Sequence, residues 1–241
     1  VGIGAGLGAI VLIKVIEWCA DGARWILDTL TIGQIGLLLV IPLGIWISWR
    51  LTIRFAPEVA GHGVPHIIAA ISVRGGRIRA RVVPLKLAAT GVTIGVGGSA
   101  GREGSIAQIG SAIGSWLGRV GQLGEKDVTA LVAAGAGAGI SATFNAPIAG
   151  MFFAMEVILR RVSIQHVHTT VIASVAGAVV AHSILGDELT FSVVPHSLDD
   201  PRQLILYAIL GVVAAGAAWL FMSALDWFEV KPLRLPGWTR P

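Results

Sequence analysis

The sequence predicts an all-α, polytopic integral membrane protein whose helices are tilted, broken and re-entrant. Of its 241 residues, 54% are hydrophobic and only 13% are charged, and the mean hydropathy is +0.79. A soluble domain carries nearer a quarter charged residues, so there is too little polar sequence here to cover a globule. Long apolar runs interrupted by glycine and proline are the third observation behind this prediction.

Eight apolar segments are expected to cross or enter the bilayer. They are residues 1–18, 33–49, 83–97, 105–119, 128–142, 146–159, 167–185 and 203–228. A helix needs about 20 residues to cross about 30 Å of hydrocarbon, and the segments between residues 83 and 159 are shorter than that. Irregular backbone at membrane depth is tolerated where protein buries it or where it lines a water-filled cavity. We therefore expect re-entrant helices rather than a simple bundle.

Glycines recur at a spacing of four residues. The repeats are Gly91 and Gly95, then Gly110, Gly114 and Gly118, then Gly135 and Gly139. In lipid, small residues at this spacing let helix backbones approach closely, so we interpret them as packing positions. The run 135–139 is not a dinucleotide loop, because no acidic residue follows about 20 positions later after a soluble strand and helix.

Charge placement predicts the orientation of the chain. Basic residues cluster at Arg74, Arg77, Arg79 and Arg81, with others at Arg50, Arg54, Arg160, Arg161, Lys231, Arg234 and Arg240. By the positive-inside rule these positions are cytoplasmic. The connector 186–202 is predominantly acidic, with Asp187, Glu188, Asp199 and Asp200, and fits the opposite face. Because topology explains the arginine cluster, we expect no nucleic-acid partner.

Several kinds of site are not expected. The single cysteine, Cys19, cannot form an internal disulfide, and there is no Cys/His metal cluster. An intramembrane hydrolase is disfavoured because Ser99, Ser105 and His62 are not arranged as a nucleophile and its base. We therefore expect neither an enzyme nor a cofactor. The chain begins at Val1 without a basic leader, and we expect it to be a segment of a longer protein.

The leading functional candidate is Glu103, which lies beside Arg102 in a glycine-rich stretch between apolar runs. A charged side chain near the bilayer midplane costs at least about 3 kcal/mol, so such residues usually line an ion pathway. Proline and glycine predict helix starts at Pro65 and Gly104. Unpaired backbone N–H groups and the helix dipole attract anions there, and two converging starts would form an anion site. The alternative is that these motifs are ordinary turns between spans.

Three ordered motifs resemble signatures of the CLC family of chloride channels and chloride/proton antiporters. Gly61-His62-Gly63-Val64-Pro65 resembles the family's GSGIP motif, and Gly101-Arg102-Glu103-Gly104-Ser105 resembles its G(K/R)EGP motif, with Gln108-Ile109-Gly110 at the familiar offset. Residues 144–150, followed by Glu156, are similar to the segment that leads toward the family's dimer interface. The resemblance covers nearly the whole chain.

The resemblance implies a homodimer in which each subunit has one pore and two inverted repeats. Residues 1–241 would form a single transmembrane domain, with 1–185 as the first repeat and 203–230 as the first helix of the second. The remainder of the second repeat has no counterpart in this sequence. The implied setting is a prokaryotic inner membrane, and the implied ligand is chloride or another small anion. Chloride, fluoride and nitrate all stay open.

The resemblance also assigns roles to residues. Glu103 becomes a gate whose carboxylate competes with anions and swings aside on protonation. The anion site would comprise His62, Gly63, Val64, Arg102, Glu103, Gly104 and Ser105. His62 replaces the usual serine and serves either as a donor to the anion or in packing. Ser105 replaces the motif proline, and we expect its hydroxyl to cap the helix.

Val157 occupies the position of the glutamate that relays protons in the family's exchangers. Valine carries no proton, and the neighbouring Glu156 points about 100° away on an α-helix. We therefore predict passive anion conduction in place of proton-coupled exchange. The alternative function is that of a truncated, non-conducting membrane scaffold or partner subunit.

Overall fold

The computed structural model describes residues 1–30, 36–160, 164–186 and 202–233. All regular elements in these ranges are helices, which confirms the predicted fold class. The chain divides into two units, Val1–Phe191 and Ser192–Pro241. The acidic residues predicted for the connector 186–202 lie outside the described residues, as do Arg161, Arg234 and Arg240.

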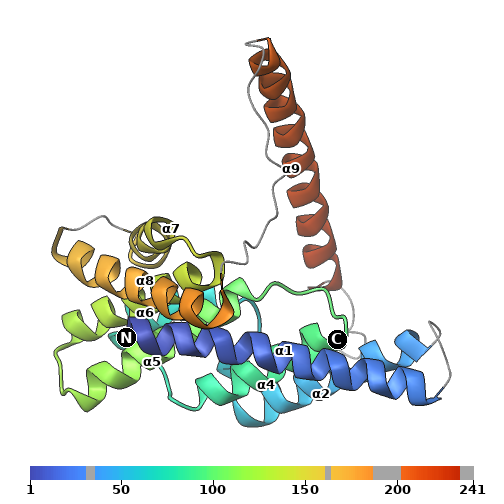
Figure 1. The fold of residues 1–241 in the computed structure, drawn as a ribbon, viewed down its shortest axis with the longest axis horizontal. Coiled ribbons are helices and arrows are strands. Elements are labelled where there is room, and N and C mark those ends of the chain that lie inside the picture. The colour runs from blue at the N-terminus through green and yellow to red at the C-terminus, as the bar shows by residue number, and fades with distance from the viewer. Residues whose placement is uncertain (31–35, 161–163, 187–201, 234–241) are drawn as a thin grey trace. The chain divides into compact units, whose positions relative to one another are not determined.

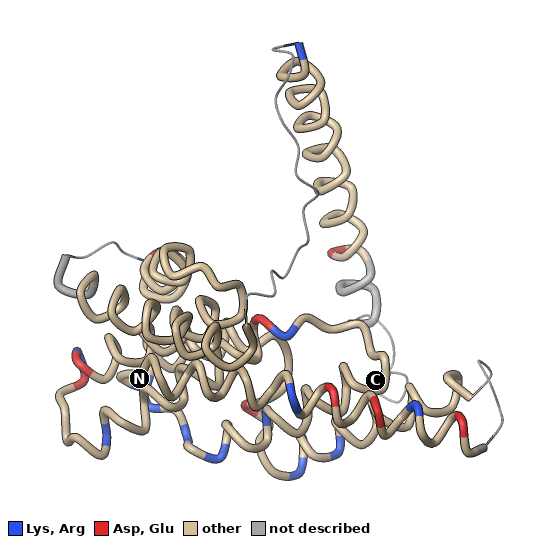
Figure 2. The backbone as a smooth tube through the Cα atoms, in the orientation of Figure 1, with Lys and Arg blue, Asp and Glu red and all other residues tan. Residues whose placement is uncertain are grey.

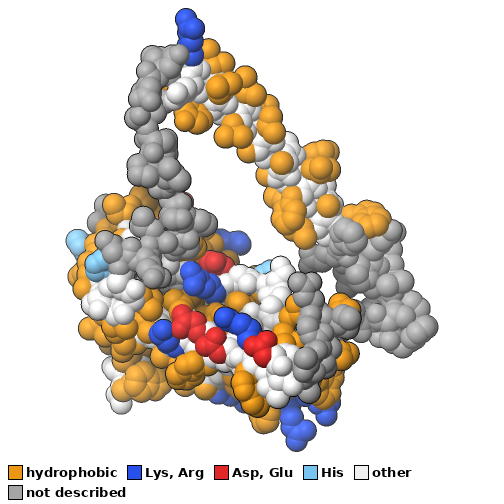
Figure 3. All heavy atoms as spheres, turned by 45° about the vertical axis from the view of Figure 1, so that its right-hand side comes forward, with side chains coloured by type: hydrophobic (Ala, Val, Ile, Leu, Met, Phe, Trp, Pro, Cys, Tyr) orange, Lys and Arg blue, Asp and Glu red, His pale blue; other side chains and the backbone are white. Residues whose placement is uncertain are grey.

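Among the residues that the structure describes, five helices are long and apolar enough to cross a membrane. They span Gly2–Thr29, Leu37–Phe55, Glu125–Phe144, Val167–Leu185 and Gln203–Trp227. Figure 2 shows long stretches of backbone without charge in these helices, and Figure 3 shows hydrophobic side chains around a group of charged ones on the face in view. In the second unit, helix α9 (Gln203–Leu233) has exposed side chains throughout 204–227.

Helix α1 (Gly2–Leu30) is longer than the predicted segment 1–18. Its charged residues pair along the helix surface, Lys14 with Glu17 at 2.8 Å and Arg24 with Asp21 at 3.3 Å. Opposite charges three residues apart stabilise a helix, so they do not end it. The predicted end at residue 18 was therefore wrong. Helix α2 (Leu37–Phe55) follows.

The segment predicted at 128–142 lies in the 20-residue helix α6 (Glu125–Phe144), which is long enough to cross a membrane, so its predicted shortness was wrong. The helix begins before the apolar run because Glu125 and Asp127 are favourable in a first turn. The other helices in the middle of the first unit are short, as predicted. They are α3 (Val64–Arg74), α4 (Val82–Gly95), α5 (Glu103–Val120), and α7 (Pro147–Phe152), which continues into a π-helical turn at Phe153–Ile158. With 11 and 14 residues, α3 and α4 are too short to cross the hydrocarbon. The helix start predicted at Pro65 is present as the start of α3. The helix itself was not among the predicted apolar segments, because its 11 residues are well below the length of a membrane span.

Glycines hold α5 against α6 (Glu125–Phe144), which also packs against α8 (Ile164–Leu185) (Figure 1). A side chain at Gly110 would meet the carbonyl oxygen of Gly135, and one at Gly135 would meet that of Gly110. One at Gly139 would lie 2.8 Å from the Ile106 carbonyl oxygen. The predicted packing role of these glycines is confirmed, since the two backbones are in direct contact.

We expect Gly135→Ala to lower the thermal stability of the protein. The new methyl group would lie 2.6 Å from the Gly110 carbonyl carbon, and overpacking of this kind costs about 1–3 kcal/mol. Thermal unfolding of the purified protein in detergent measures the effect. The matched control is Gly22→Ala on α1, where no heavy atom lies within 4 Å of the new methyl. Equal melting temperatures for the two variants would contradict the packing role.

Candidate functional site

The starts of α3 and α5 are in direct backbone contact. A side chain on Gly104 would collide with the His62 carbonyl oxygen, and one on Gly63 would lie 2.5 Å from the Gly104 carbonyl oxygen. Gly63 also has φ +85°, a conformation that other residues adopt only with strain. The two predicted helix starts therefore do meet, and the first turn of a helix has backbone N–H groups without a partner inside the helix.

A cavity of about 560 Å³ opens beside this contact. Of the residues predicted to bind an anion, His62, Val64, Glu103, Gly104 and Ser105 line it. Two other predicted residues do not: Gly63 is buried against Gly104, and Arg102 lies partly exposed at the residue before α5. The structure thus brings most of the predicted site together around one cavity.

Glu103 is the first residue of α5 and is partly buried. Its carboxylate lies over Gly101, whose hydrogen leaves room for it. Among the residues that the structure describes, no ion pair joins this carboxylate to the adjacent Arg102. The negative charge therefore lies at the positive end of a helix, where it is favoured, and on the wall of the cavity.

Lys86, which was not among the predicted site residues, supplies a positive charge to the same cavity. It lies on α4 with 4% of its surface exposed, and its Nζ donates to the carbonyl oxygens of Val59 at 2.8 Å and Gly61 at 2.9 Å. These bonds hold the loop that leads into α3. A lysine inside the apolar segment 83–97 was the available signal, because charge at membrane depth is costly and commonly functional.

Hydroxyl groups from three helices line the rest of the cavity. Ser48 on α2 donates to the Ala89 carbonyl oxygen at 2.8 Å, and Thr93 Oγ1 lies 2.8 Å from Ser48 Oγ. Ser105 Oγ lies 2.9 Å from Thr90 Oγ1, and α5 has no side-chain hydrogen bond at its N-cap. The expected capping role of Ser105 was therefore wrong, because its hydroxyl joins α5 to α4 instead.

Gln108 and Glu58 support the loop before α3 from the other side. Gln108 is buried and its Nε2 donates to the Glu58 carbonyl oxygen at 2.9 Å. The Glu58 carboxylate lies 3.3 Å from Arg81 and 3.5 Å from Arg79. Burial by itself raises the pKa of Glu58, but its hydrogen bonds and the charges of Arg81 and Arg79 outweigh burial and hold that pKa below its usual value.

The remaining predicted position, Val157, lies away from the cavity. It is 40% exposed on the π-helical turn, and neither it nor the exposed Glu156 lines the space beside Glu103. π-Helical turns inside helices occur frequently at functional sites.

We expect Lys86→Met to destabilise the protein by about 3 kcal/mol, because two buried carbonyl oxygens lose a charged hydrogen-bond donor. Chemical denaturation of the purified protein measures this change. The matched control is Lys14→Met on α1, which removes only a half-exposed pair worth about 0.3–0.5 kcal/mol. Similar losses in both variants would argue against a structural role for Lys86 at the cavity.

The lowered pKa of Glu58 predicts a pH dependence of stability. Its carboxylate stabilises the folded state above the usual carboxyl pKa of about 4.5, and this contribution is lost as the pH falls through the lower pKa of the folded state. Melting temperatures between about pH 5 and pH 3 should therefore fall more steeply in the wild type than in Glu58→Gln. Arg81→Gln, which removes a partner, should flatten the profile in the same direction. An unchanged slope in both variants would contradict the assignment.

The family of voltage gated chloride channels matches this chain over residues 44–240. The H(+)/Cl(−) exchange transporter ClcA of Vibrio cholerae is 32% identical over 171 residues, which are 70% of this chain and 36% of that relative. Chloride channel protein CLC-f of Arabidopsis thaliana is 34% identical over 149 residues, which are 60% of this chain and 19% of that relative. The chain thus spans about a third or less of the length of these relatives.

Solved structures agree with this match. A slow cyanobacterial Cl−/H+ antiporter superposes with a TM-score of 0.78 and 26% identity, covering 98% of this chain and 57% of that chain. A CLC-type fluoride/proton antiporter gives the same TM-score at 24% identity, covering 97% and 57%, and supports the fold alone. With its apolar helices, the chain is a multi-pass membrane protein, and it belongs to the voltage gated chloride channel family, the CLC family.

Proposed function

We propose that this chain contributes the pathway of a CLC-type anion transporter, with the anion held where α3 and α5 begin. The observation that carries the proposal is the backbone contact between these two helix starts beside a cavity that also contains Lys86. Two positive helix ends and one buried ammonium group favour a small anion over a cation. Hydroxyl groups of α2 and α4 make the same space polar.

Glu103 is the proposed gate of this pathway. It is the only carboxylate among the residues that line the cavity, and it lies at the start of α5 where an anion would also bind. Its charge therefore competes with the anion for the same positive potential. Protonation would remove that advantage and free the site, which links anion occupancy to pH.

We infer passive conduction in preference to proton-coupled exchange. Val157 carries no titratable group, and the neighbouring Glu156 lies exposed outside the cavity lining. Several similar proteins are named as exchangers or antiporters, whereas we infer passive conduction for this chain. The inference depends on valine at position 157, which cannot carry a proton.

The remaining features of the proposal follow from family membership. Chloride is the proposed transported anion, in line with the name of the Vibrio relative. The proposed assembly is a homodimer in a prokaryotic inner membrane. Residues 1–185 would form the first of two inverted repeats, and residues 203–230 would begin the second. His62, exposed at the cavity, would donate to the anion in place of the family's serine.

Chloride efflux from liposomes tests the gate. We expect wild-type efflux to rise as the pH is lowered from neutral, because protonated Glu103 no longer competes with chloride. Glu103→Gln carries no titratable carboxylate, so its efflux should be fast at all pH values. The matched control is Glu156→Gln, which neutralises a carboxylate outside the cavity lining and should keep the wild-type pH profile.

Proton movement is recorded in the same vesicles with a pH dye. We expect a chloride gradient to drive no uphill proton flux. Proton uptake against its gradient would contradict passive conduction while leaving the anion pathway intact. Absence of flux in both the wild type and Glu103→Gln would favour the alternative, a non-conducting scaffold or partner subunit.

A further inference from the structure

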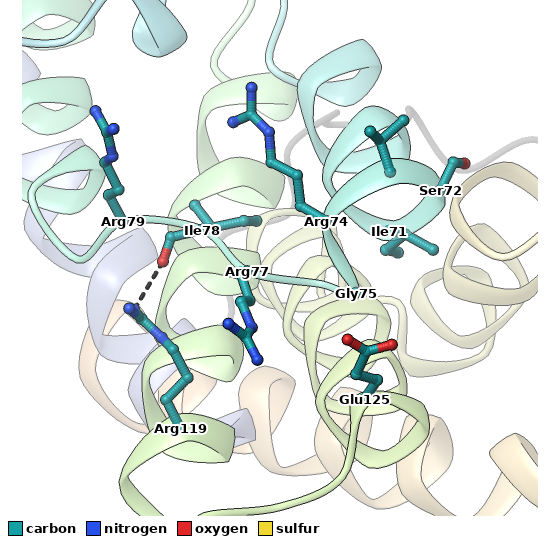
Figure 4. A pocket seen from close by; sticks show the side chains of 10 residues that line it. Ile71, Ser72, Arg74, Gly75, Arg77, Ile78, Arg79, Arg119 and Glu125 are labelled. Atoms are coloured by element: carbon teal, nitrogen blue, oxygen red, sulfur yellow. Dashed lines mark hydrogen bonds between the residues drawn. The ribbon is translucent and has the colours of Figure 1, made fainter.

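A second cavity, of about 660 Å³, lies at the opposite ends of α3 and α5 and shares no lining residue with the cavity at Glu103. Figure 4 shows its walls: the end of α3, the connector 75–81, the last turn of α5 and the start of α6. Four arginines line it, Arg74, Arg77, Arg79 and Arg119, against one carboxylate, that of Glu125. The lining therefore has an excess of three positive charges.

Most of this charge is not neutralised by the protein. Glu58 lies 3.5 Å from Arg79 but pairs more closely with Arg81, which is outside the cavity lining. Arg74 and Arg77 are exposed, and neither makes an ion pair with another described residue. These like charges share one cavity lining, so the positive potential there favours binding of a multiply charged anion.

The backbone around the cavity is fixed rather than loose. Arg119 Nη2 donates to the Ile78 carbonyl oxygen at 2.7 Å, and the Ile78 backbone N–H donates to Ser115 Oγ at 2.8 Å. Gly75 ends α3 in the left-handed region with φ +55°, and the Gly76 N–H donates to the Ala70 carbonyl oxygen at 2.9 Å. The connector is therefore held against α5, and the arginines project from a preorganised frame.

The chemistry of the lining selects the class of ligand. Guanidinium groups present paired N–H donors that match the oxygens of a phosphate group, and several arginines together suit more than one negative charge. The volume is in the range of about 300–1,000 Å³ that is typical of sites for small organic ligands, and it is far larger than a halide needs. Positive charge here also offsets the negative dipole ends of α3 and α5.

We propose that this cavity is a binding site for a phosphate-bearing ligand, with Arg74 and Arg77 as its principal contacts and Arg119 as a fixed third one. The proposed ligand carries at least two negative charges, as a diphosphate or a phosphomonoester headgroup does. By the orientation predicted from charge placement, the site faces the cytoplasm. The shared chemistry allows either a soluble phosphate or a lipid headgroup, for which Ile71 and Val73 provide an apolar wall.

Two binding measurements on the full chain distinguish these sources. Calorimetric titration of the detergent-purified protein with inorganic pyrophosphate reports a soluble ligand. Retention in nanodiscs of phosphatidic acid over phosphatidylcholine, measured by mass spectrometry of the bound lipid, reports a headgroup. We expect the double variant Arg74→Gln/Arg77→Gln to weaken whichever interaction is found by at least about tenfold, equivalent to about 1.4 kcal/mol.

The matched control is Arg50→Gln/Arg54→Gln on α2, which removes the same charge outside the cavity and should leave binding within about twofold. Loss confined to the first double variant supports the site, and the probe that binds identifies the source. Equal loss in both double variants shows attraction to net charge only and overturns the proposal. Absence of binding by both probes in the wild type overturns it as well. Melting temperatures of all variants verify that each is folded.

Discussion

The structure depends on two helix starts that touch through glycine. Gly63 and Gly104 let the backbones of α3 and α5 come together at a distance that any side chain would prevent. At this point both helices still have unpaired N–H groups, and water is not freely available at membrane depth to satisfy them. A carboxylate, an anion, a hydroxyl or water in the adjoining cavity can serve as the partner. The position of Glu103 at this junction is the first consequence of that requirement.

Other contacts hold the junction in place without adding side chains to it. The glycine contacts between α5 and α6 fix the position of α5. Lys86 and Gln108 donate hydrogen bonds to carbonyl oxygens of the loop before α3 from two directions. Charged and amide donors are stronger partners for buried carbonyl groups than waters that exchange. Burial of Lys86 is therefore tolerated because the loop provides two carbonyl acceptors for its ammonium group. Its charge then adds to the potential at the cavity.

The sequence predicted the features that follow from local rules. Proline and glycine punctuation located the start of α3 and the start of α5, and glycine spacing identified the α5 and α6 contact. Features that depend on tertiary contacts could not be predicted from local sequence. Ser105 was expected to cap α5, but Thr90 on a neighbouring helix offers its hydroxyl a partner. Arg102 was expected at the anion site, yet its position before the first turn keeps it off the cavity wall. The contacts of Lys86 depend on a loop 25 residues away in sequence.

The two cavities of the first unit lie at opposite ends of the same pair of helices, α3 and α5. At the N-terminal ends, peptide dipoles and the Lys86 ammonium group favour the one small anion that we propose binds there. At the C-terminal ends the dipoles have the opposite sign, and arginines reverse the local potential. A ligand that joined Arg74 at the end of α3 to Arg119 at the end of α5 would restrain the relative position of the two helices. Because their other ends form the proposed anion site, its geometry would respond only if that ligand bound two arrangements of the helices with different affinity.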